Sequence, residues 1–514
     1  MKQDRNLYFG DIHNHCGISY AHGSLDDALN NARERLDFCS VTGHAHWCDM
    51  PERNERIDYI VDFHEKGFEK LRRGWHEVLK TMKDAHKPDT FVTFPGFEVH
   101  SNADGDRAVV YREHTGELMR PGTIPQLERD LLALAEGGVE ALSLPHHIGY
   151  RRGARGINWD TFNEQASPIV EVFSMHGASE HTDGPIPYRH SMGPADARST
   201  VQYGLKQGHV FGFSANTDHH SAHPGSYGQG MTAVWADSLT SEAIWSALRN
   251  RRTVALTGDR MSVDYELDGA PMGSIRPAGA FSGIRASITG GAAIDCVDLV
   301  QDSTIVRRIS PGDSAIRNES ISAGGERIES LIHLEVGWGP RGVRREWDVE
   351  VGISDGEITN VEPRFRGPDV LSPVQKDSAS QETSAYYSRN EWIDSRKTRF
   401  STVTYGNPTN TTSAMQGVCL HVDVPRNAKV QMRLNGVYAE VPVEALLEGG
   451  RVGHLIDEID APAWLLHRMP APGEYRWTID LPETKGELSP GRPMYLRVRQ
   501  QNGQWAWASP VFGR

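Results

Sequence analysis

Residues 7–260 alternate between short apolar stretches and longer polar segments with helical spacing. One polar segment, "SLDDALNNARERL", starts with Ser24, a residue type that caps helices, and has an acidic first turn. Alternation of this kind predicts a parallel α/β architecture. The apolar stretches are "LYFGDIH", "DFCSVTGH", "FVTFPGFEVH", "ALSLPHH", "PIVEVFSMH" and "HVFGFSANTDHH". The other helix-like segments are residues 52–87, "IPQLERDLLALAEGG", "ADARSTVQYGLKQG" and "TSEAIWSALRNRR".

The pattern changes after residue 260. Stretches such as "SLIHLEVGW", "EWDVEVGISDG" and "KVQMRLNGVYAEVPV" alternate apolar and polar positions and are separated by Gly, Asn, Asp and Pro. This pattern predicts antiparallel β structure, arranged as one or two sandwiches. We therefore expect two parts, residues 1–260 and 261–514. The polar segments 372–390 and 405–414 are expected to be long loops, or a joint between β units near 372–414.

Composition narrows the class of protein. The 514 residues, 38% of them hydrophobic, are enough for a large core, and no run of about 18 apolar residues predicts a membrane helix. The five cysteines are odd in number and contain no CxxC pair, which indicates reduced thiols in a cytoplasmic protein without a secretory signal. The net charge of −14 disfavours binding to nucleic acid or to anionic membranes, but allows a local pocket for a small anion. The oligomeric state is not indicated.

Residues that can bind metal ions stand at the ends of the apolar stretches in the first part. In parallel barrels the carboxyl ends of the strands meet at one face, where the active site lies. Nineteen of the 23 histidines precede residue 260. The candidates at the stretch ends are His13, His15, His44, Glu98, His100, His146, His147, His176, Asp218, His219 and His220.

The types of these residues indicate which metals could bind. Imidazoles mixed with carboxylates, without thiolates, suit Zn²⁺, Mn²⁺ or Fe. The candidates exceed the three or four ligands that one catalytic zinc uses, so we expect two or three divalent ions. Glu98 and Asp218 could bridge or anchor neighbouring ions, as carboxylates do in two-metal hydrolases.

Five of these motifs together resemble the PHP (polymerase and histidinol phosphatase) superfamily of metal-dependent phosphoesterases. The motifs are "DIHNHCGIS", "SVTGH", "FPGFEVH", "SLPHH" and "SANTDHH". The chain also resembles a bacterial branch of that superfamily known mainly as an uncharacterised domain family, through "VEVFSMHGASE", "RRTVALTGDR" and "YLRVRQQNGQWAWASPVF". The resemblance implies a distorted (β/α)7 barrel with three metal ions in residues 7–260, followed by the β-rich region.

The resemblance also implies how the ligands divide among the ions. One ion would be held by His13, His15, Glu98 and Asp218. Glu98 would bridge to a second ion held by His146 and by either His100 or His114, and a third would be held by His22, His44 and His220. The second motif usually reads Asp-His in this superfamily, whereas this chain has Gly43-His44.

The chemistry expected at such a centre is hydrolysis by metal-activated water. Arg151, Arg152 and Arg155 follow the fourth apolar stretch and could clamp an anionic substrate. His147 or His176 could protonate the leaving oxygen. The sequence therefore predicts a phosphoesterase acting on a small anionic substrate.

Two alternatives stay open at this point. The same metals could cleave a glycosidic, sulfate, ester or amide bond, and tryptophans of the β-rich part could bind carbohydrate. Alternatively, the protein could bind metal without catalysis. The tryptophans are Trp338, Trp347, Trp392, Trp464, Trp477, Trp505 and Trp507.

Overall fold

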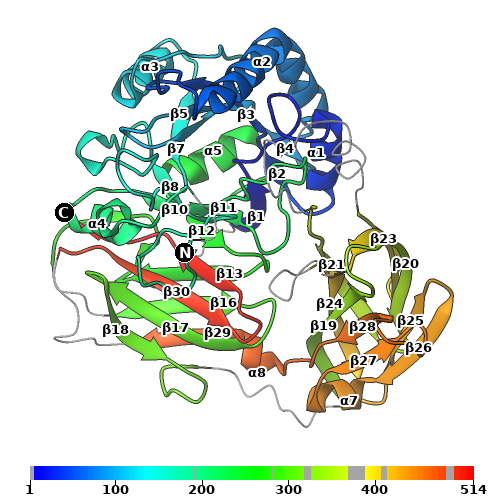
Figure 1. The fold of residues 1–514 in the computed structure, drawn as a ribbon. Helices are drawn as coiled ribbons and strands as arrows, with labels where there is room; N and C mark the ends of the chain where they lie inside the picture. The colour runs from blue at the N-terminus through cyan, green and yellow to red at the C-terminus, as the bar shows by residue number, and fades with distance from the viewer. Residues whose placement is uncertain are drawn as a thin grey trace.

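The computed structural model describes residues 5–188, 192–279, 283–317, 326–368, 388–406, 414–481 and 491–514 (Figure 1). Most of the predicted loop segments 372–390 and 405–414 lies outside these residues. The α-helices are α1 (Leu25–Arg33), α2 (Asp58–Ala85), α3 (Ile124–Glu136), α4 (Val201–Lys206), α5 (Ser241–Arg249), α7 (Val443–Glu448) and α8 (Pro472–Tyr475).

The helices of the first part form where the pattern predicts them. Ser24 caps α1 through a capping box, in which its hydroxyl accepts from the N–H of Asp27 while the Asp27 carboxylate accepts from the N–H of Ser24. In α2, Leu71, Trp75 and Val78 recur at helical spacing and are buried. Within the described ranges, no helix combines the length and the apolar character that a membrane crossing requires.

The strands of the first part belong to three sheets (Figure 1). A nine-stranded sheet has the order β18 (Thr304–Ile309), β17 (Ile294–Gln301), β30 (Met494–Gln500), β31 (Trp505–Ala508), β12 (Thr253–Leu256), β11 (Met231–Ala236), β1 (Asn6–Asp11), β2 (Phe38–Cys39) and β4 (Val92–Thr93). A four-stranded sheet has the order β3 (Thr42–Trp47), β5 (Gly96–His100), β6 (Arg107–Tyr111) and β7 (Ala141–Pro145). A three-stranded sheet has the order β10 (Gly212–Ala215), β8 (Ile169–Ser174) and β9 (Gly177–Ala178).

The predicted α/β class of the first part is confirmed, but a closed (β/α)7 barrel is not among the sheets of the described residues. β1, β2 and β4 pair in parallel, as do β3 with β5 and β8 with β10. β6 departs from this pattern because it pairs antiparallel with both β5 and β7. A hairpin between β5 and β6 thus takes the place of a crossover helix, and it brings the residues before β6 back to the end of β5.

The β-rich region predicted after residue 260 is also confirmed. Two five-stranded sheets pack over an apolar core that includes Leu334, Val349, Val418 and Leu420. One has the order β21 (Glu357–Arg364), β24 (Gln416–Pro425), β19 (Arg327–Trp338), β28 (Pro462–Leu466) and β27 (Arg451–His454). The other has the order β22 (Arg389–Asp394), β23 (Lys397–Tyr405), β20 (Arg344–Ile353), β25 (Lys429–Leu434) and β26 (Val437–Pro442).

The remaining strands form one small sheet and one strand pair, and the sheet lies below the first part and beside the sandwich (Figure 1). They form a four-stranded sheet of β14 (Ala270–Pro271), β13 (Ser262–Leu267), β16 (Ile284–Thr289) and β29 (Arg476–Leu481), and a pair of β15 (Ile275–Arg276) with β32 (Phe512–Gly513). β31 near the carboxyl terminus pairs with β12, and through it joins β1 in the nine-stranded sheet. The predicted division at residue 260 stays a prediction, and this sheet contains strands from both sides of it.

Candidate metal centre

The structure brings the strand ends of the first part to one place. His13 and His15 follow β1, His44 lies on β3, and Glu98 and His100 lie on β5. His146 follows β7, and Asp218 and His220 follow β10. We call these eight side chains the ligand cluster. All are buried except His220, which is partly exposed.

Glu98 is the central carboxylate of the ligand cluster. Its Oε2 lies 3.0 Å from Nδ1 of His44 and 3.3 Å from Nε2 of His15. Its Oε1 lies 3.1 Å from Nδ1 of His100 and 3.1 Å from Nε2 of His146. The two oxygens of one side chain therefore face two separate sets of imidazoles.

Asp218 is the second carboxylate and faces the His15 side of the cluster. Its Oδ1 lies 3.0 Å from Nε2 of His15 and 3.6 Å from Nε2 of His13. Its Oδ2 lies 2.7 Å from Nε2 of His176. Asp218 adopts a left-handed backbone with φ of 52°, a conformation that costs energy and is common at functional sites. On the adjoining side, the Nε2 atoms of His44 and His220 are 3.3 Å apart.

The chemistry of this donor set fits divalent metal ions. The combinations whose ligand atoms lie within 4.8 Å of one another include His15–His44–His220, His13–His15–Asp218, His44–Glu98–His100 and Glu98–Asp106–His146–His147. Nε2 of His13, Nδ1 of His44 and Oε2 of Glu98 are buried and face one another, but without the geometry of a hydrogen bond, and they make none with the other described residues. Buried polar atoms without partners are costly, and cations would satisfy them.

Metal binding needs ionised carboxylates and neutral imidazoles, and the pKa shifts of Glu98 and His220 favour these forms. Burial alone would raise the pKa of Glu98, but His100, His44 and His146 outweigh it and hold that pKa well below its usual range. Burial, with a contribution from His15, lowers the pKa of His220 to about 3. Burial would also lower the pKa of His13, but the charges of Asp218 and Glu171 raise it well above its usual value. The negative potential of these carboxylates also attracts metal cations.

Two carboxylates that the sequence analysis did not select lie next to the ligand cluster and contact its histidines. Glu171 on β8 accepts from Nδ1 of His13 at 3.0 Å, and Nδ2 of Asn216 donates to the same Glu171 oxygen at 3.1 Å. Asp106, just before β6, has its Oδ2 2.9 Å from Nδ1 of His100. A carboxylate that holds the second nitrogen of a ligating imidazole fixes the ring and raises its basicity. In the sequence, Glu171 is marked only by being the one charged residue inside the apolar stretch "PIVEVF".

The two predicted proton donors lie beside the cluster. Nε2 of His176 contacts Asp218, and the Tyr150 hydroxyl lies 3.0 Å from Nδ1 of His176. Nε2 of His147 lies 3.4 Å from Oδ2 of Asp106. Burial and the neighbouring His146 hold the pKa of His147 well below its usual value. Both imidazoles are therefore close enough to exchange protons with a molecule bound at the cluster.

The three predicted substrate-binding arginines separate in the structure. Only Arg155 reaches the cluster, where its Nε donates to Oδ2 of Asp106 at 2.6 Å. Arg152 pairs with Asp160 at the surface at 2.7 Å, and Arg151 is exposed.

The remaining histidine candidates also separate. The backbone N–H of His22 donates to the His220 carbonyl at 3.0 Å, and its imidazole is partly buried, so its role as a ligand stays a prediction. His114 lies away from the cluster, with its Nε2 2.9 Å from Oγ1 of Thr93. Of the two alternatives for the second ion, His100 is therefore the one beside Glu98.

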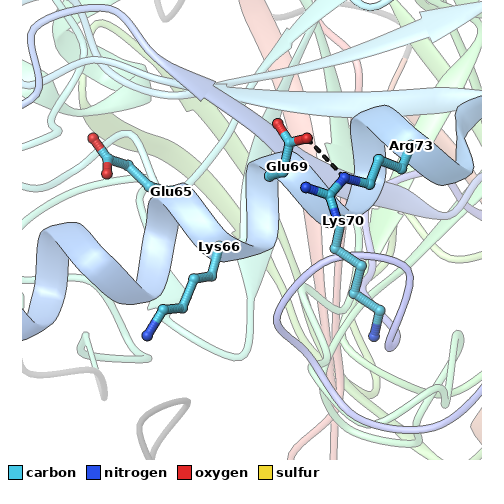
Figure 2. A pocket seen from close by; sticks show the side chains of 5 residues that line it. All are labelled: Glu65, Lys66, Glu69, Lys70 and Arg73. Atoms are coloured by element: carbon cyan, nitrogen blue, oxygen red, sulfur yellow. Dashed lines mark hydrogen bonds and ion pairs between the residues drawn. The ribbon is translucent and has the colours of Figure 1, made fainter.

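A hollow lies on the surface of α2, away from the ligand cluster. Figure 2 shows the charged side chains that line it, including the Glu69–Arg73 pair, in which Nε of Arg73 donates to Glu69 at 2.8 Å. The other lining residues are Glu65, Lys66 and Lys70. Exposed pairs of this kind contribute little energy, and the hollow takes no part in the ligand cluster.

Comparison with known proteins yields relatives without an assigned activity. Residues 194–265, which include Asp218 and His220, match a family described as a protein of unknown function (DUF3604). An uncharacterized protein of Chlamydia pneumoniae is 23% identical over 48% of this chain and 42% of its own length. One of Chlamydia trachomatis is 24% identical over 53% of this chain and 50% of its own length. The chain thus spans about half the length of these curated relatives.

Among solved structures, the chain is similar to a two-domain protein from Bacteroides vulgatus. That protein is described as containing a predicted PHP-like metal-dependent phosphoesterase. The match has 15% sequence identity and a TM-score of 0.32, and covers 61% of this chain and 81% of the other.

Proposed function

We propose that this protein is a metal-dependent hydrolase, and that its substrate is a small phosphate ester. The observation that carries the proposal is the position of Glu98, whose two oxygens each face two imidazoles at 3.0–3.3 Å inside a buried site. Buried carboxylates and imidazoles from five separate strands are costly to gather without a ligand. A site of this composition is typical of two-metal hydrolases.

Divalent ions at the cluster would supply a water molecule of lowered pKa, hence hydroxide at neutral pH, and positive charge for the transition state. His13, His15, His44, Glu98, His146, Asp218 and His220 would hold them, with His100 and His22 as further candidates. The protein's own residues supply the rest of the chemistry.

Proton transfer to the leaving group falls to the His176 side of the site. His176 lies between Asp218, 2.7 Å from its Nε2, and the Tyr150 hydroxyl, 3.0 Å from its Nδ1. A carboxylate on one nitrogen orients the ring toward the site, as a general acid requires. His147 is a second candidate, since its ring lies 4.7 Å from that of His176.

Phosphate is favoured over neutral substrates because a guanidinium borders the site. Arg155 is always charged, and its fork matches the geometry of phosphate oxygens. The tryptophans that could have bound carbohydrate mostly serve packing instead: Trp347, Trp464, Trp477, Trp505 and Trp507 are buried. Trp392 is 44% exposed, which keeps glycosides as the comparison substrate in the test.

The experiment is an activity assay on the full chain with an aryl phosphate and the matching aryl glycoside. We expect phosphate hydrolysis that is lost after exhaustive chelation and returns with Mn²⁺ or Zn²⁺. The surface variant His76→Asn serves as a control and should behave like the natural protein, since His76 is exposed on α2. Activity that survives chelation, or cleavage of the glycoside alone, would overturn the proposal.

A further inference from the structure

Arg155 lies among atoms that would otherwise bind a metal ion. Its Nη2 is 2.5 Å from Nδ1 of His100 and 3.7 Å from Oε1 of Glu98, and it also contacts Oδ2 of Asp106. His100, Glu98 and Asp106 are all buried. The positive charge that faces Oε1 of Glu98 is therefore supplied by the protein's own Arg155 guanidinium.

From this arrangement we propose that the Arg155 guanidinium takes the place of one metal ion, so that the centre holds two ions and one permanent organic cation. The proposal rests on the function proposed above. It divides the ligand cluster into a metal side, facing Oε2 of Glu98, and an arginine side, facing Oε1.

The position of the guanidinium gives the physical reason. Nδ1 of His100 faces Nη2 of Arg155 and two carboxylates, with Oδ2 of Asp106 at 2.9 Å and Oε1 of Glu98 at 3.1 Å. The guanidinium therefore fills the space that an ion bound to these carboxylates would need, and it supplies the positive charge there. The other nitrogen of His100, Nε2, lies 3.2 Å from the Tyr20 hydroxyl.

The protein holds the guanidinium in this position from several directions. Nε of Arg155 donates to Asp106 at 2.6 Å, Nη1 points to Sδ of Met192 at 3.2 Å, and the guanidinium carbon lies 5.7 Å from the centre of the Trp47 ring. The side chain is only 19% exposed. Arg155 itself has φ of 68°, a left-handed conformation that persists only where the surroundings impose it.

The metal side keeps enough ligands for two ions. His13, His15 and Asp218 form one set and His15, His44 and His220 the other, and Oε2 of Glu98 lies 3.0 Å from Nδ1 of His44 and 3.3 Å from Nε2 of His15. A guanidinium cannot lose its charge in a protein, so it repels a further divalent ion permanently. Nη1 of Arg155 carries a second N–H besides the one that points to Met192. The guanidinium can therefore also bind and neutralise a phosphate oxygen, as a third metal ion would.

The test is the number of metal ions per chain in the full protein, loaded with Mn²⁺, desalted and measured by elemental analysis. We expect two ions in the natural protein and in Arg155→Lys, which keeps the charge. We expect three in Arg155→Met, which keeps the length and loses the charge. Arg151→Met is the matched control, because Arg151 is exposed in the same loop, and it should keep two.

Asp106→Asn separates the proposal from one in which Asp106 is itself a metal ligand. If Asp106 partners Arg155, the variant still holds two ions; if Asp106 binds a third ion, the natural protein holds three and the variant fewer. Three ions in the natural protein, or an unchanged or smaller number in a folded Arg155→Met, would overturn the inference. If Arg155→Met does not fold, the counts for the natural protein and Asp106→Asn decide. No bound metal at all would instead overturn the proposed function.

Discussion

Two regions of this molecule are equally buried and chemically opposite. Between the two five-stranded sheets, Leu334, Val349 and Leu420 are fully buried and apolar. At the strand ends of the first part, His13, His15 and Glu98 are as deeply buried but polar, and some of their atoms make no hydrogen bond with the described residues. Apolar burial stabilises a fold, whereas unsatisfied polar burial costs stability. The difference indicates that the polar strand-end region is suited to bind a ligand, whereas the apolar core of the sandwich holds the shape of the fold.

The largest expected effect comes from a change in the ligand cluster. In Asp218→Asn the side chain keeps its shape but loses the charge that faces His15 and His176 at 3.0 and 2.7 Å. We expect a loss in kcat/KM on the order of 10⁴-fold and a lower metal content. Activity and elemental analysis measure both.

Asp160→Asn is the matched control for that change, because Asp160 is an exposed carboxylate of the same part, and it should leave both quantities unchanged. The contrast between the two regions would fail if Asp218→Asn lost its fold instead of its metal. Circular dichroism and thermal melting of the metal-free protein distinguish the two outcomes.

The next effect is on stability and belongs to the sandwich. Trp347 is 2% exposed, and its Nε1 donates to Oγ1 of Thr404 at 2.7 Å. Trp347→Ala leaves a cavity and an unpaired hydroxyl, so we expect a loss of about 3–5 kcal/mol in the free energy of unfolding. Denaturant titration measures it. The metal content per folded chain should not change, and a lower content would show that the two regions are coupled.

Trp392→Ala provides the comparison for that measurement. Trp392 lies on β22 of the sheet that contains Trp347, but it is 44% exposed. Removing it takes little apolar area out of a packed environment, so the free energy of unfolding should change by less than about 1 kcal/mol.

What could be predicted from the sequence differs between the regions for physical reasons. The ligands at strand ends could be predicted because a strand end is marked by local pattern, as His146 after "ALSLP" illustrates. Asp106 could not, because it reaches His100 only through the antiparallel hairpin of β5 and β6. Arg155 was predicted as a substrate-binding residue. Its inward position beside His100 could not be predicted, because that position depends on the left-handed backbone of Arg155.

The sheet order was beyond local pattern as well. β31 pairs with β12 across about 250 positions of the chain, through contacts such as Ala255 with Trp507. Alternation shows that each is a strand, but not which partner it takes. Glu180 makes long-range contacts of the same kind: its carboxylate accepts from Nε1 of Trp507 on β31 at 2.8 Å and from Nη1 of Arg497 on β30 at 2.9 Å.

The smallest effect sharpens the comparison at the edge of the metal centre. Glu171 touches His13 but none of the atoms that would hold an ion, so it marks where the binding region ends. Glu171→Gln keeps the hydrogen-bonding shape and removes the charge that orients His13. Losses of outer carboxylates of this kind typically cost about 10–100-fold in metal affinity or activity. We expect metal affinity, measured by competition with a chelator, to fall within that range while the number of ions stays the same. Glu136→Gln, an exposed residue at the end of α3, should change neither. A loss as large as that of Asp218→Asn would mean that Glu171 is itself a ligand. An unchanged affinity would mean that Glu171 does not support metal binding and that the binding region is confined to the ligand cluster.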